Sequence, residues 1–275
     1  MSAKKYFVYE LKKSLFAICS LALIMIAVSV TVVLTARFES EWSTPESGLT
    51  VLVIMGGALA AVVPIWMLAY KMKKRSVDLY YALPLKRGQV LRVKYLLGLI
   101  ATYAPYTLAF LFGIVAAAIK YRAQAIGVGY YFAAYFASLP ALYCIYSIIS
   151  FVFTRAERLI DGIVFAVFWM FAAFAVASSV EMFFNAVASS MYAPFSPFET
   201  IAEYFSPLIE TPALPHEHYG VGTLVNMSIG YVLTGLPAVA ATVLLFVTEQ
   251  KAKAENLGGV SDSPFGYKVM IPLFT

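Results

Sequence analysis

SLFAICSLALIMIAVSVTVVLTA, residues Ser14–Ala36, contains no Asp, Glu, Lys or Arg. An α-helix needs about 20 predominantly apolar residues to cross the hydrocarbon core of a bilayer, and this stretch supplies them. Lipid offers no hydrogen-bond partners, so a segment of this length must satisfy its backbone amides internally, as a helix does. Five further stretches have the same character: Gly48–Tyr70, Tyr95–Ile119, Gly129–Phe153, Leu159–Phe184 and Val221–Thr248. The sequence therefore predicts an all-α, polytopic integral membrane protein with six transmembrane helices.

The composition excludes an ordinary soluble domain. Of the 275 residues, 61% are hydrophobic and 13% are charged, whereas soluble domains carry about 25% charged residues. A surface with so little charge must be covered largely by lipid. The formal net charge of +5 does not indicate a nucleic-acid partner, because the basic residues lie between the hydrophobic stretches, where they set membrane orientation.

The distribution of Lys and Arg predicts the orientation of the spans. All but 3 of the 20 basic residues lie before the first span, between the second and third, between the fourth and fifth, or after the sixth. The exceptions are Arg37, Lys120 and Arg122. By the positive-inside rule, the basic segments and both termini are cytoplasmic. We therefore expect a multi-pass protein of the cell membrane.

The sequence carries no pattern typical of an ion-driven carrier or an enzyme. Carriers of this kind keep ionisable residues deep in their spans, whereas Asp161 and Glu181 lie near the two ends of the fifth span, where water can solvate them. Cys19 and Cys144 fall inside spans and are expected to be small buried apolar side chains. The His-Glu-His triplet at 216–218 is expected to be a solvated loop, since side chains at i and i+2 seldom converge on a metal.

A G-x-x-x-x-G-K-[ST] phosphate loop is also absent from the sequence, so the chain does not bind ATP by that route. We expect no catalytic residue, metal or cofactor on this chain. Active transport would draw its energy from another polypeptide.

The longest cytoplasmic segment, KMKKRSVDLYYALPLKRGQVLRVKY from Lys71 to Tyr95, combines basic and apolar residues. Val77 with Tyr81, and Leu79 with Leu83, stand four residues apart, which predicts a short helix with apolar ridges over about residues 75–83. Pro84 ends this helix because the residue before a proline is pushed out of the helical region. Such a helix suits either the anionic inner leaflet or a groove on a soluble partner, and the residues alone leave both open.

The run Arg75-Ser-Val-Asp78-Leu-Tyr-Tyr-Ala-Leu83-Pro84-Leu-Lys-Arg87 resembles a loop of the type-2 ABC exporter permeases, closest to those of Gram-positive bacteria. In that family the loop between the second and third spans is the coupling helix, which inserts into a separate ATPase subunit. The basic and aromatic segment before the first span, residues 1–13, is similar to the family's interfacial elbow helix. The resemblance covers the six-span layout.

The resemblance implies a permease subunit of an ABC exporter in the bacterial cytoplasmic membrane, with a substrate that the sequence does not identify. Its partners would be a cytoplasmic ABC ATPase subunit and a second permease copy or related permease. The residues in contact with the ATPase would be Leu79, Tyr80, Leu83 and Pro84. Arg75 would also take part in coupling, and Asp78 and Arg87 would form the polar rim of the contact.

We expect one permease domain over residues 1–254, which includes the elbow helix (1–13), the coupling loop (71–94) and an outer loop (185–220). In the outer loop, Ser196-Pro197-Phe198-Glu199 has the pattern of an N-cap, a first-turn proline and a capping-box glutamate, which predicts a short helix. Residues 255–275 are either a cytoplasmic tail or the start of a further segment. The alternative function is a non-transporting sensor or assembly scaffold that recruits a cytoplasmic partner through residues 71–94.

Cysteine labelling tests the orientation in a variant without Cys19 and Cys144. We expect Ser76→Cys and Ser261→Cys to react only with a maleimide that enters the cytoplasm, because the basic segments are cytoplasmic. Ser206→Cys should react with an impermeant maleimide from outside. Labelling of Ser76→Cys from outside in intact cells would reverse the orientation.

Overall fold

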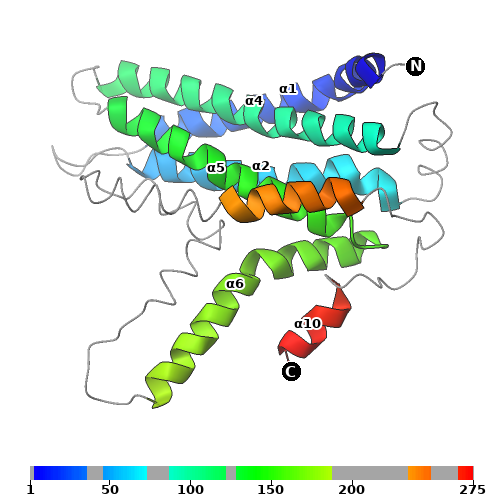
Figure 1. The fold of residues 1–275 in the computed structure, drawn as a ribbon. Coiled ribbons are helices and arrows are strands. Elements are labelled where there is room, and N and C mark those ends of the chain that lie inside the picture. The colour runs from blue at the N-terminus through cyan, green and yellow to red at the C-terminus, as the bar shows by residue number, and fades with distance from the viewer. Residues whose placement is uncertain are drawn as a thin grey trace.

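The computed structural model describes residues 3–35, 46–72, 87–121, 128–187, 235–248 and 266–274. Over these residues every regular element is a helix, which confirms the all-α prediction for this part of the chain. The labelled helices are α1 (Ala3–Thr35), α2 (Glu46–Leu68), the short 3-10 helix η1 (Ala69–Met72), α4 (Arg87–Tyr121), α5 (Val128–Phe153), α6 (Leu159–Val187) and α10 (Tyr267–Phe274). A further apolar helix covers Gly235–Thr248 and is drawn in orange in Figure 1.

Four of the described helices are long and apolar enough to cross a membrane. They cover Ala3–Thr35, Val51–Met72, Gly88–Lys120 and Tyr135–Phe153. At the fifth predicted span, α6 covers Leu159–Val187, and Leu159–Ala172 forms its first apolar stretch; at the sixth, the described helix Gly235–Thr248 is shorter than a span. The long helices are those of a multi-pass membrane protein, while the count of six spans and the orientation of the termini stay predictions.

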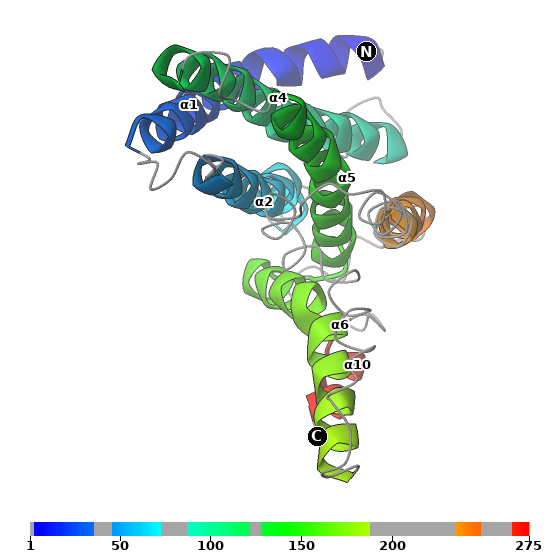
Figure 2. The same cartoon turned by 90° about the vertical axis from the view of Figure 1, so that its left-hand side faces the viewer.

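The long helices pack side by side. α1 contacts α4 along its length, and α2 contacts both α4 and α5. α6 begins beside α5 and then leads away from the other helices, as Figures 1 and 2 show from two sides. The start of α1, the end of η1, the start of α4 and the end of α5 lie at one end of the bundle (Figure 1). The segments predicted to be cytoplasmic therefore begin or end at the same end of the molecule.

Two helices extend beyond the apolar stretches from which they were predicted. α1 begins at Ala3 and runs through Ser14, and α4 begins at Arg87, before Tyr95. Hydropathy marks only the apolar part of a helix, whereas the helix continues as long as its backbone bonds propagate. At 1.5 Å per residue α4 is roughly 50 Å long, about 20 Å more than the hydrocarbon core of a bilayer. The basic first turns of α4 therefore stand outside the apolar layer.

The first turns of α1 run across the direction of the other helices, as comparison of Figures 1 and 2 shows. The sequence predicts an interfacial helix over residues 1–13, and the structure has residues 3–13 as the bent beginning of a continuous α1. Ser14 Oγ donates to the carbonyl of Glu10 at 2.9 Å, a bond that perturbs the backbone ladder and favours bending. A segment that crosses the spans in this way has the direction of the membrane surface.

Glycines bring neighbouring helices close together. Tyr146 of α5 is fully buried and donates its hydroxyl to the carbonyl of Tyr95 on α4 at 2.8 Å, and a Cβ added at Gly98 would collide with that hydroxyl. Gly56 on α2 lies under the ring of Tyr106, whose carbons would stand 2.8 Å from an added Cβ. Small residues at such positions let apolar helices approach closely in lipid.

Side chains also join α1 to α4 through main-chain carbonyls. Ser29 Oγ donates to the carbonyl of Ala109 at 3.0 Å. Lys120 Nζ donates to the carbonyls of Val33 and Leu34, at 3.1 and 2.8 Å, at the C-terminal end of α1. The last carbonyls of a helix lack partners within it and carry a partial negative charge, so a lysine there satisfies both. The two helices are thus joined at mid-length and near their ends.

Gly98→Ala should destabilise the protein, because Tyr146 cannot withdraw from the added Cβ without breaking its bond to Tyr95. Overpacking of this kind costs about 1–3 kcal/mol. Gly88→Ala is the control, since a Cβ there meets nothing within 4 Å. Thermal unfolding of the purified protein in detergent compares the two. Equal melting temperatures would contradict the close packing of α4 on α5.

Candidate functional site

The loop between η1 and α4 carries the residues predicted to couple to an ATPase. Most of them lie outside the described residues, namely Arg75, Asp78, Leu79, Tyr80, Leu83 and Pro84. Arg87 is the first residue of α4. The structure describes both flanks of the loop, η1 ending at Met72 and α4 beginning at Arg87, at the same end of the bundle (Figure 1). The described part of the site is the pair of helix ends from which residues 73–86 extend.

The N-terminal segment of α1 packs against both flanks of this loop. Tyr6 of α1 forms a small buried cluster with Val90 and Val93 of α4. Phe7 and Tyr70 pack against the cluster, and Tyr70 belongs to η1. Three segments that are distant in the sequence therefore meet at the base of the loop.

A buried ion pair joins α1 to α4 beside this cluster. Lys94 Nζ lies 2.7 Å from Glu10 Oε2, and the two side chains are only 9% and 5% exposed. The hydroxyl of Tyr6 donates to Glu10 Oε1 at 3.0 Å, so both carboxylate oxygens have a donor. Lys94 Nζ also stands 5.7 Å from the ring centroid of Tyr70, within reach of a cation–π interaction. We refer to Glu10, Lys94, Tyr6 and Tyr70 as the Glu10–Lys94 cluster.

Burial makes this ion pair costly to break. A charged group that leaves water loses roughly several kcal/mol of solvation free energy. Its ion-pair partner and its hydrogen bonds must offset that loss. With both partners present the charges satisfy each other, whereas removal of one leaves an uncompensated buried charge. The pair therefore specifies where α1 sits on α4 more than it raises the overall stability.

The pairing of Glu10 with Lys94 is not predicted above, although the sequence carries a signal for Glu10. The buried residues of α1 are Tyr6, Glu10, Ser14, Ile18, Ala22, Met25, Ser29 and Val33. Their spacing of three or four residues is that of one helix face, and Glu10 extends this face into a segment of lysines. An acidic residue in such a place indicates a buried basic partner, but the pattern does not say which one.

Asp161 at the start of α6 is partly exposed, as expected near the end of a span, and in addition it has a hydrogen-bond partner. It accepts a hydrogen bond from the hydroxyl of Tyr267 at 2.8 Å, and this bond raises the pKa of Tyr267 above its ordinary value. The Tyr267 ring packs edge-on against Phe165, with centroids 5.0 Å apart, and Met270 is buried. α10 is therefore held against the first turns of α6.

Of the remaining candidate residues, the two cysteines are described by the structure and the others are not. Cys144 is buried as expected, whereas Cys19 is exposed on α1 because it falls beside the buried face and not on it. Among the described residues, no group of three or more His, Cys, Asp or Glu could hold a metal ion. The triplet at 216–218 and the helix predicted to start at Ser196 lie outside the described residues.

Comparison with known proteins gives no family, since no protein-family model and no curated protein matches this chain. The kind of membrane protein that this chain is must therefore be argued from its own residues.

Lys94→Met should destabilise the protein by about 3–5 kcal/mol, because Glu10 then stays buried without its partner. The double variant Glu10→Gln, Lys94→Met removes both charges and should recover much of this loss. Lys13→Met changes an exposed lysine of α1 and should shift stability by less than about 0.5 kcal/mol. Unfolding midpoints in detergent measure all three variants. A double variant no more stable than Lys94→Met alone would argue against a buried pair.

Proposed function

We propose that this chain is the membrane-spanning permease subunit of an ATP-binding cassette exporter in the bacterial cytoplasmic membrane. A separate cytoplasmic ATPase subunit hydrolyses the ATP, and a second permease copy or a related permease completes the transporter. The observation that carries the proposal is the Glu10–Lys94 cluster, which anchors both flanks of residues 73–86 to α1. A loop that only rested on lipid would not need a buried, charged anchor at its base.

The anchored flanks supply a route for mechanical work. In the proposal the ATPase contacts Leu79, Tyr80, Leu83 and Pro84, and its ATP-driven closure pushes on the loop. The push enters α4 at Arg87. Because α4 is one helix from Arg87 to Tyr121, a displacement of its first turn is carried to the opposite side of the membrane.

α1 would move together with α4. The two helices are joined near the loop by Glu10 and Lys94, and at the far end by Lys120 and the last carbonyls of α1. Two helices joined near both ends behave as one body, which can rotate or slide against α2 and α5. A switch between inward- and outward-facing states needs such relative motion of packed bodies.

The charge distribution of the spans favours an energy source outside this chain. Tyr95–Ile119 and Val128–Phe153 contain no Asp, Glu, Lys or Arg. These helices therefore offer no ionisable group to bind or relay a coupling ion. Hydrolysis of ATP on a partner polypeptide is the source that remains consistent with this composition.

Leu79→Asp should abolish recruitment of an ATPase, because it places an unpaired charge in the partner's groove. A lost central contact costs about 2 kcal/mol or more, and a buried unpaired charge costs more still. The tagged chain is purified from membranes of its own host with and without the substitution. We expect the parent to carry a polypeptide with a phosphate loop and ATP hydrolysis, and the variant to carry neither.

Neutralising Lys73, Lys74 and Arg75 together gives the matched comparison. A loop that rests on the anionic inner leaflet should lose lipid binding in this variant and tolerate Leu79→Asp. If the Leu79→Asp variant recruits as much ATPase as the parent chain does, the exporter assignment is wrong. A partner without a phosphate loop would favour the sensor or scaffold.

A further inference from the structure

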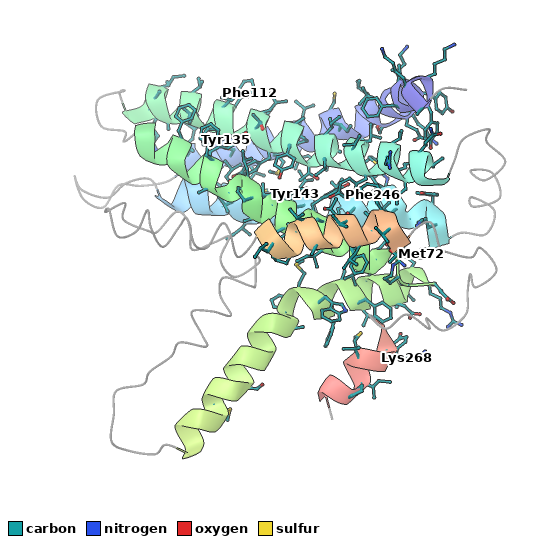
Figure 3. All side chains as sticks on the ribbon, viewed as in Figure 1. Met72, Phe112, Tyr135, Tyr143, Phe246 and Lys268 are labelled. Atoms are coloured by element: carbon teal, nitrogen blue, oxygen red, sulfur yellow. The ribbon has the colours of Figure 1, made fainter. Side chains whose placement is uncertain are left out.

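Tyrosine, serine and threonine hydroxyls gather between α4, α5 and the helix Gly235–Thr248. Tyr143 of α5 and Tyr95 of α4 both reach Thr242 Oγ1, at 2.9 and 3.0 Å, so one threonine links three helices. Figure 3 shows Tyr143 and Phe246 where α5 meets this last helix. Counted along the helices from the end that carries the loop, Tyr103 stands roughly 24 Å from the start of α4 and Tyr143 roughly 15 Å from the end of α5.

The hydrogen-bond donors around Thr242 can be assigned. Thr242 donates its only hydroxyl hydrogen to the carbonyl of Ala238 at 2.9 Å, because a carbonyl oxygen only accepts. Tyr95 and Tyr143 must therefore both donate to Thr242. Neither tyrosine has a hydroxyl hydrogen left for a ligand.

The neighbouring hydroxyls follow the same pattern. Thr107 donates to the carbonyl of Tyr103 and so accepts from Tyr135, each at 2.8 Å. Tyr103 donates its own hydrogen to the carbonyl of Leu139 at 2.8 Å. These tyrosines can still offer a ligand the lone pairs of their phenol oxygens and the faces of their rings. A ligand that meets them finds acceptors and no free tyrosine donor.

Tyr103 and Tyr143 are the two rings of this group that are only half-buried and unstacked within the described residues. Tyr135, by contrast, stacks on Tyr106 and Phe110, with centroids 5.7 and 4.3 Å apart. Tyr103 bonds to the carbonyl of Leu139, and Tyr143 follows Leu139 by one helical turn. The two rings therefore flank the same turn of α5.

The stretches of helix that carry these rings have no charged residue, while Arg92, toward the loop end of α4, places its guanidinium 5.9 Å from the ring centroid of Phe246. Tyr95–Ile119, Val128–Phe153 and Gly235–Thr248 contain no Asp, Glu, Lys or Arg. The face of an aromatic ring is negative, so it attracts a cation within about 6 Å of its centroid and repels an anion. The complementary ligand has an apolar body that suits the span and a positive group that suits the rings and the phenol oxygens.

We propose that Tyr103 and Tyr143 form a binding site for lipophilic cations, in which Thr242 holds the ring of Tyr143 in position. As the substrate class of an exporter, this assignment rests on the proposed function. Binding itself is a property of the two rings and does not require an ATPase. The site lies nearer the end of the bundle predicted to be cytoplasmic, where an exporter takes up its substrate.

Tetraphenylphosphonium and tetraphenylborate test the site, because they have nearly the same shape and opposite charges. The full chain in lipid nanodiscs should bind labelled tetraphenylphosphonium saturably, above empty nanodiscs, and should not bind tetraphenylborate in this way. Tyr103→Leu and Tyr143→Leu should each weaken binding about tenfold, since each removes one ring. Tyr143→Phe keeps the ring and should weaken binding less than about threefold.

Phe112→Leu is the matched control, because Phe112 is an exposed ring of α4 that belongs to no part of this group (Figure 3). It should leave the affinity for tetraphenylphosphonium unchanged. Thermal unfolding shows whether each variant is folded. Where a leucine variant does not fold, the comparison of the two ions on the parent chain still tests the site. Equal binding of the two ions, or unchanged affinity in both leucine variants, would overturn the proposal.

Leu79→Asp separates this site from the proposed function. Its loop lies outside the spans, so it should bind tetraphenylphosphonium like the parent. A chain that binds the cation and recruits no ATPase keeps the site and loses the exporter assignment. A chain that recruits an ATPase and binds no cation keeps the exporter assignment and loses the site.

Discussion

The ion pair between Glu10 and Lys94 constrains the whole loop end of the bundle. Two charges removed from water are satisfied in one arrangement, and a shift of α1 along α4 would break it. Apolar contacts between long helices resist such a shift less, because lipid offers similar surroundings. The pair therefore sets the register of α1 on α4. The bonds of Ser29 and Lys120 further along the two helices agree with that register.

Inside the spans, hydroxyls and glycines hold the helices where charges do not. Pro105 and Pro140 lie within α4 and α5 and each removes a backbone donor. Tyr103 and Tyr146 donate to main-chain carbonyls across this interface. Such bonds contribute on the order of 1 kcal/mol each in a membrane. An interface built from many modest contacts is stable and can still rearrange.

Hydropathy found the long helices because length and apolar character are local properties of the chain. Ser14–Ala36 was predicted in this way, and all of it except Ala36 falls within α1. Contacts between distant residues leave no such local trace. Glu10 meets a lysine 84 residues away, and Asp161 meets a tyrosine 106 residues away. The predicted coupling residues other than Arg87 lie outside the described residues, so their assignment still rests on the resemblance of that short run.

The apolar parts of α1 and α4, Ser14–Thr35 and Tyr95–Ile119, are roughly 33 and 38 Å long, a little more than the hydrocarbon core of a bilayer is thick. An apolar stretch that is longer than the hydrocarbon core tilts or distorts the lipid around it. Each ångström of mismatch costs roughly a fraction of a kcal/mol. Since α1 and α4 are joined near both ends, they adopt one tilt. The acyl-chain length of the surrounding lipids then biases the angle of this pair, which makes membrane thickness a determinant of the resting conformation.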